Sequence, residues 1–227
     1  MRARAPLIGL VVALTVSACA QNPDHQTSTF LELYADANPT PAHFRECHGF
    51  ACNETSRVSL SPQQWQRVGA VFKPHAPNAR AERRQIAQAV ALMQRMVGAQ
   101  TGTAVHQWTH QDMNILPNLS DPTQLDCIDE AVNTWTYTTM MEKSGFFRFH
   151  RVAQLSNGGS LHDPRNTAVV QEINGDYYAI DAALVDMGTP PPVIPLVTWI
   201  SVWPPDLKAL EAKEPGKKEP AKRVAAR

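Results

Sequence analysis

Apolar side chains recur at helical spacing in the first half of the chain. Between residues 79 and 97 they return every three or four positions, which predicts an amphipathic helix with one buried face. These apolar positions are Ile86, Val90, Met93 and Val97. An earlier helix is predicted to start at Ser61, because Ser61 can cap it, Pro62 suits the first helical position and Gln64 completes a capping box.

A third helix is predicted from Cys127 to about residue 143. Asp126 is placed to cap it, and Asp129 and Glu130 put negative charge in its first turn, where the helix dipole favours it. Gly145 follows the last helical positions and is expected to end the helix. A lone cysteine therefore opens this helix.

The pattern after residue 145 is that of β-strands. Aromatic and β-branched residues predict strands over 146–152, 167–173 and 177–181, with a turn at 157–159 and an Asn174-Gly175 hairpin. A short helix is expected over 195–203. The predicted fold class is α+β, with N-terminal helices followed by a cysteine-led helix that packs on a small antiparallel sheet.

Composition limits the class of protein. The 227 residues are 43% hydrophobic and 19% charged, which suits one globular domain with tails. Lys+Arg 21 equals Asp+Glu 21, so bulk charge predicts no nucleic-acid partner. We expect a domain over 41–204, a flexible tether over 19–40 and a disordered charged tail over 205–227.

The first 18 residues have the layout of an export signal. Arg2 and Arg4 precede an apolar run over 5–16, which is short for a membrane span. The run ends in Val16-Ser17-Ala18-Cys19, which resembles a bacterial lipoprotein signal with Cys19 as the lipidated residue. This predicts a lipid anchor on the periplasmic side of the cell envelope. Ala20 favours the outer membrane by the enteric sorting rule. The alternative is an ordinary secretory signal with Cys19 incidental.

Cys47 and Cys52 lie five residues apart around a glycine, and in an oxidising compartment this spacing favours a local disulfide. Cys127 is then left over, either as a small buried side chain or as a thiol at a helix N-terminus, where a thiolate is stabilised. A competing arrangement pairs Cys127 with Cys47 or Cys52.

A third arrangement is a zinc site. It would need Cys47, His48 and Cys52 to converge with His106 or His110. No other metal or cofactor is implied by the sequence.

The order of parts around Cys127 resembles the transglutaminase-like superfamily, in which a cysteine opens a helix, a histidine begins a strand and an aspartate ends the next strand. Cys127, the strand over 167–173 and Asp181 follow this order. Cys47-His48-Gly49-Phe50 and the run from Leu125 to Glu130 also resemble a group of uncharacterised proteobacterial exported lipoproteins. At the strand start, however, this chain has Arg165 and Asn166 in place of the histidine.

The resemblance implies a papain-like Cys–His–Asp site. With no strand histidine, His162 is the expected base, with His150 second, and Asp181 would orient it. Cys127 would then form a thioester with a protein or a peptidoglycan peptide, as an amide hydrolase, peptidase or acyltransferase. The alternative is a catalytically inactive lipoprotein that serves as a binding or structural module in the envelope.

Overall fold

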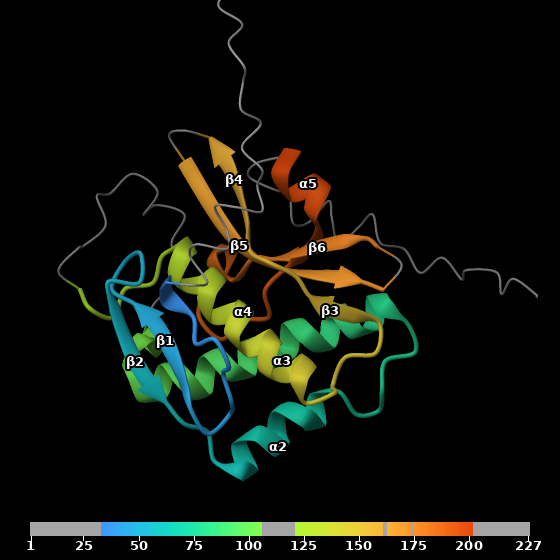
Figure 1. Ribbon diagram of the computed structural model, residues 1–227, viewed down its shortest axis with the longest axis horizontal. Coiled ribbons are helices and arrows are strands. Elements are labelled where there is room, and N and C mark those ends of the chain that lie inside the picture. Colours follow the sequence, from blue (N-terminus) through green and yellow to red (C-terminus); the bar gives the residue numbers. More distant parts are fainter. Residues whose placement is uncertain (1–32, 106–120, 161–162, 174, 202–227) are drawn as a thin grey trace, which may run out of the picture.

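The protein has an α+β fold with two antiparallel sheets (Figure 1). The computed structural model describes residues 33–105, 121–160, 163–173 and 175–201. The signal segment, most of the expected tether and the charged tail lie outside these ranges. The described part of the expected tether packs on the domain, because Ala35 is buried and Asp36 pairs with Arg45 at 2.8 Å.

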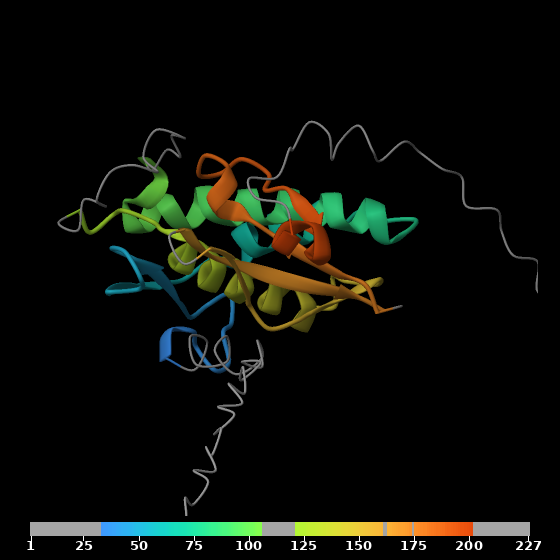
Figure 2. The ribbon, with the colours of Figure 1, turned by 90° about the horizontal axis from the view of Figure 1, so that it is seen from above.

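The chain enters the domain through a hairpin that the sequence did not predict. Strands β1 (Phe44–His48) and β2 (Glu54–Val58) pair antiparallel, with Cys47 opposite Thr55. This hairpin lies at the end of the molecule where the cysteine-led helix begins, as Figure 2 shows from above.

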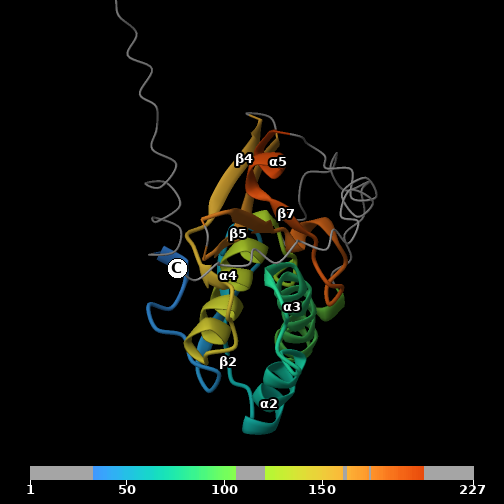
Figure 3. The ribbon, with the colours of Figure 1, turned by 90° about the vertical axis from the view of Figure 1, so that its right-hand side faces the viewer.

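The helices begin where the sequence predicts. Helix α2 (Pro62–Val71) has Ser61 as its N-cap, with both halves of the capping box formed. Helix α3 (Ala79–Thr101) runs four residues beyond the predicted end and stops at Gly102, whose φ of 85° is left-handed. Helix α4 (Cys127–Lys143) begins after Asp126, as expected. Figure 3 shows α3 and α4 side by side beneath the sheet.

Among the described residues, the larger sheet has five strands. Its order is β3 (His150–Val152), β5 (Asp163–Glu172), β6 (Tyr177–Ile180) and β7 (Val193–Pro195), and β4 (Ser156–Ser160) pairs with β5. All pairs are antiparallel. A single turn of 3₁₀ helix, η3 (Ala182–Leu184), follows β6, and another, η1 (Thr103–Val105), follows α3.

The two faces of this sheet carry different elements. Val170 and Ile180 belong to the main core with the buried side chains of α3 and α4. Ala179 and Ile194 instead pack with Trp199 of the short helix α5 (Leu196–Ser201). Because successive side chains of a strand point to opposite faces, α4 and α5 cover opposite faces of the sheet.

Two strand predictions were wrong in detail. The strand expected over 146–152 begins only at His150, because Phe146 instead stacks between Trp65 and Phe72, with ring centroids 5.5 and 5.4 Å away. The turn expected over 157–159 is part of β4. Gly158 fits there because a β-carbon at this position would lie 2.6 Å from the ring of Trp199.

The buried face of α3 should carry much of the stability. Met93 is fully buried in the main core, and Met93→Ala is expected to lower the free energy of unfolding by about 2–5 kcal/mol through lost contacts and a cavity. Val197→Ala is the control: Val197 is 72% exposed, and we expect a change within about 0.5 kcal/mol. Urea unfolding measures both. An equal change in the free energy of unfolding for the two substitutions would contradict the placement of Met93 in the main core.

Candidate functional site

The candidate site is built around the first turn of α4. The Asp126 carboxylate accepts hydrogen bonds from the backbone N–H groups of Ile128 and Asp129, at 3.0 and 2.9 Å. The Asp129 carboxylate in turn accepts from the Asp126 N–H at 3.0 Å, which completes a capping box. Cys127 is the first residue of this helix, so the Asp126 cap sets its place at the helix start.

A disulfide-closed loop sits against the same turn. Cys47 and Cys52 are joined by a disulfide. The loop they close has left-handed φ values at Gly49 and at three further residues, Phe50, Ala51 and Cys52. Such values cost a non-glycine residue about 1–2 kcal/mol each, so other contacts must hold the loop.

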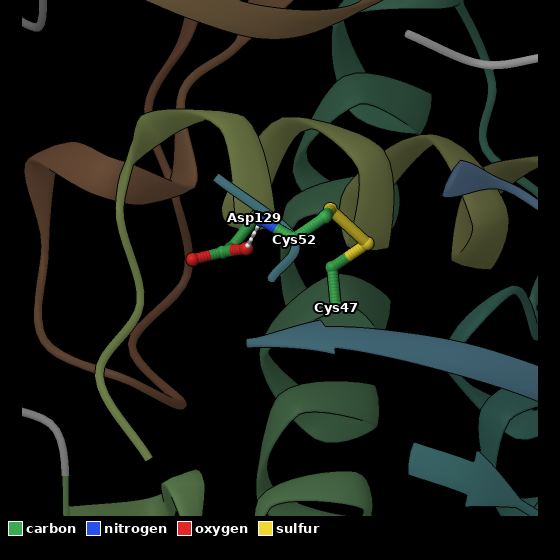
Figure 4. A group of neighbouring side chains, drawn as sticks. All are labelled: Cys47, Cys52 and Asp129. Carbon is green, nitrogen blue, oxygen red and sulfur yellow. Dashed lines mark hydrogen bonds between the residues drawn. A yellow bond between two sulfur atoms is a disulfide. The ribbon is translucent and has the colours of Figure 1, made fainter. Parts of the chain in front are cut away.

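Side chains of α4 supply those contacts. The Ala51 N–H donates to Asp126 at 3.1 Å, and the Cys52 N–H donates to Asp129 at 2.7 Å (Figure 4). Asn133, one turn further along, bonds both the N–H and the carbonyl of Cys47, at 2.8 and 2.9 Å. The helix therefore holds the loop through three polar side chains.

The Cys127 thiol is not part of a disulfide, and it faces strand β5. The side-chain amide of Asn166 donates to its sulfur at 3.7 Å, and the Asn166 backbone N–H also acts on it. Burial, and then the negative charge of Asp126, raise the pKa of Cys127 to about 11, although the Asn166 donors and the Arg165 charge act in the opposite direction. At neutral pH the group is a neutral thiol.

Asp181 is buried and is engaged by α5. Its carboxylate accepts a hydrogen bond from the Trp199 indole at 2.7 Å. Burial raises its pKa to about 6, while the Trp199 hydrogen bond and the Arg165 charge act to lower it. Asp181 follows β6 directly, and its carboxylate bonds a residue that packs with Ala179. Cys127 of α4 instead contacts Asn166 of β5.

The histidines expected as bases are placed differently. His162 lies outside the described residues. His150 is buried, and its Nδ1 lies 2.9 Å from the Glu82 carboxylate. His150 also pairs with Glu172 across the sheet, six residues along β5 from Asn166, or about 20 Å of extended strand. His150 is therefore not a partner of Cys127.

Of the histidines of the expected zinc site, the structure describes only His48, and its ring does not join the two loop cysteines. His48 directs its ring nitrogens to the Pro122 carbonyl and the Ser56 hydroxyl, at 2.6 and 2.8 Å. His106 and His110 lie outside the described residues. The side chain that does approach both sulfur atoms is Asp129, whose carboxylate oxygen lies within 4.8 Å of each.

Buried carboxylic acids line α4 and were not predicted from the sequence. The Tyr137 hydroxyl lies 2.7 and 2.6 Å from the two oxygens of Glu46, and burial raises the pKa of Glu46 well above its usual value. Glu130 accepts from the Gln94 amide at 3.0 Å, and burial raises its pKa to about 7. The only feature of the sequence that indicates the burial of Glu46 is its position between the apolar residues Phe44 and Cys47.

Comparisons with protein families, with curated proteins and with solved structures find no match to this chain. Within the described ranges, no helix has the length and apolar character needed to cross a membrane.

Asp181 should make stability depend on pH. Its pKa of about 6 in the folded state exceeds the ordinary value of 3.8, so folding favours the protonated acid and stability falls as pH rises from about 4 to about 6. The charges acting on it come from Arg165 on β5 and Glu130 on α4. Asp181→Asn keeps an acceptor for Trp199 and does not titrate.

We therefore expect Asp181→Asn to match the wild type near pH 4 and to become more stable than it by up to about 3 kcal/mol near pH 7. Urea unfolding at the two pH values measures this difference, in which the titrating groups that do not interact with Asp181 cancel. A stability difference between the two proteins that is the same at both pH values would show that Asp181 does not titrate in this range.

The Asp126 carboxylate should stabilise both the start of α4 and the disulfide loop. Asp126→Ala removes the acceptor for the α4 N–H groups and for the Ala51 N–H, with an expected loss of about 1–3 kcal/mol. Asp126→Asn keeps one oxygen acceptor and should lose less than half of that. Thermal or urea unfolding measures both variants, and an equal loss would contradict the capping role.

Proposed function

We propose that this chain is a catalytically inactive transglutaminase-like domain, which serves as a binding or structural module in the bacterial cell envelope. The observation that carries the proposal is a hydrogen bond to the Cys127 sulfur. Within the described residues the Asn166 amide on β5 donates this bond, and the resemblance expects a histidine at the start of the same strand.

An asparagine keeps a hydrogen-bond donor on the sulfur but removes acid–base chemistry. Thioester formation requires a group that takes the thiol proton and then returns a proton to the leaving amine. A carboxamide does neither at neutral pH, and the Arg165 guanidinium does not lose its proton. The thiol pKa of about 11 supports the same conclusion, since the thiolate is the nucleophile.

The position of Asp181 adds independent support. In a Cys–His–Asp site the carboxylate accepts a hydrogen bond from the histidine and orients it. Here the Asp181 carboxylate accepts from the Trp199 indole. The third member of the expected site thus has a structural partner in α5.

The proposal keeps the envelope setting predicted from the sequence. A lipid on Cys19 would tether the domain on the periplasmic side, and a protein or a peptidoglycan peptide would be its partner. The enzyme hypothesis, with His162 as base, stays a prediction that the described residues do not test. The experiment below separates the two.

The test is the rate at which iodoacetamide alkylates Cys127 at pH 7.5 in the unreduced, otherwise wild-type chain with Cys19→Ser, read by intact mass. For the wild type we expect slow labelling, unchanged within about twofold by His162→Ala. Asn166→His should raise the rate about tenfold or more, because an imidazole on the sulfur can form a thiolate–imidazolium pair.

Asn166→Ala is the control for loss of the carboxamide and should not accelerate labelling. Circular dichroism shows whether each variant is folded. Fast labelling of the wild type that His162→Ala abolishes would overturn the proposal in favour of an enzyme. A folded Asn166→His protein with no gain would show that residue 166 does not occupy the position of the base.

A further inference from the structure

The strongest unassigned cluster of metal-binding side chains lies beneath the disulfide loop. The two sulfur atoms of Cys47 and Cys52 and a carboxylate oxygen of Asp129 all lie within 4.8 Å of one another, and all three residues are buried. They come from β1, from the end of the loop and from the first turn of α4 (Figure 4). We propose that, once the disulfide is reduced, these three side chains form a binding site for a zinc ion.

The spacing fits the size of such a site. Zinc binds sulfur at about 2.3 Å and carboxylate oxygen at about 2.0–2.2 Å, so donors around one ion lie about 3.5–4 Å apart. The three donor atoms are already within 4.8 Å of one another. Small side-chain rotations after the sulfur–sulfur bond opens would bring them to this range.

The surrounding hydrogen bonds hold the three donors in place without using the disulfide. The two oxygens of Asp129 accept from the N–H groups of Cys52 and Asp126, at 2.7 and 3.0 Å. The backbone of Cys47 is fixed on both sides by Asn133. Such outer contacts orient metal ligands, and here they come from a helix that does not depend on the loop for its own hydrogen bonds.

Charge favours a cation once the cysteines are reduced. Two thiolates and the Asp129 carboxylate would lie beside Asp126, whose charge acts on Asp129. Burying that much negative charge without a counter-ion is costly. Two thiolates with one carboxylate suit zinc better than the hard cations magnesium and calcium, which bind through oxygen.

The chemistry balances with a dithiol as the reductant. The dithiol gives two electrons and two protons to the Cys47–Cys52 bond, which opens to two thiols, while the dithiol closes to its own disulfide. Zinc then displaces the two thiol protons, which are released to solvent. Disulfide and zinc are therefore mutually exclusive ways of closing the same loop.

The experiment uses the full chain with Cys19→Ser and Cys127→Ser, so that Cys47 and Cys52 are the only thiols. The protein is reduced with excess dithiol, desalted without oxygen and titrated first with Co²⁺ and then with Zn²⁺. We expect one ion per chain, a sulfur-to-cobalt absorption band and its loss when zinc displaces cobalt. The oxidised protein should give no such band.

Asp129→Asn should weaken zinc binding by at least about tenfold, because it removes a charged ligand. Glu130→Gln is the matched control, since Glu130 is a buried acid on the same turn whose carboxylate bonds Gln94. It should bind zinc within about threefold of the parent protein. Circular dichroism on the reduced protein tests whether the fold is retained.

Three results would overturn the inference. These are a reduced protein that binds no cobalt or zinc, an affinity that Asp129→Asn leaves unchanged, and an equal loss in Asp129→Asn and Glu130→Gln. The outcome is independent of the Cys127 labelling test, because Cys127 is absent from the titrated protein.

Discussion

The Asp126 cap is the interaction on which the rest of the site depends. One carboxylate ends the extended chain, starts α4 and accepts the Ala51 N–H from a segment 75 residues earlier. Cys127 has its place because the helix begins there, and the left-handed loop keeps its shape because the helix offers acceptors to its N–H groups. A helix cap usually makes contacts within one turn of its helix. Here the Asp126 cap also connects the N-terminal hairpin to the main domain.

Features set by neighbouring residues could be predicted from the sequence. Ser61 and Pro62 place the start of α2, and Asp126 places the start of α4, because caps act within one turn. The stripe from Ile86 to Val97 is buried, since helical spacing alone puts those side chains on one face. The α+β class followed from these helices and from the hairpin at Asn174-Gly175.

Features set by distant residues could not be predicted. The β1–β2 hairpin depends on contacts with α4 across 86 residues, as between Cys47 and Asn133. Cys127 and Asn166 are 39 residues apart in the sequence, and no local pattern predicts their contact. Trp199 accounts for two features that the sequence did not predict. Its ring fills the space beside Gly158 in β4, where a turn was expected. Its indole N–H donates a hydrogen bond to Asp181.

Helical geometry lets the first turn of α4 take part in two sulfur-containing sites, one at Cys127 and one at the disulfide loop. Residues 127 and 129 are two positions apart, or about 200° around the helix axis, so their side chains leave on opposite sides. Cys127 reaches β5, and Asp129 reaches the disulfide loop. The same negative charge, that of the half-buried Asp126 carboxylate, acts differently on the two sides. Beside Cys127 the Asp126 charge opposes thiolate formation, which suits a site without turnover. Beside Cys47 and Cys52 it would hold a cation, provided that the disulfide is open.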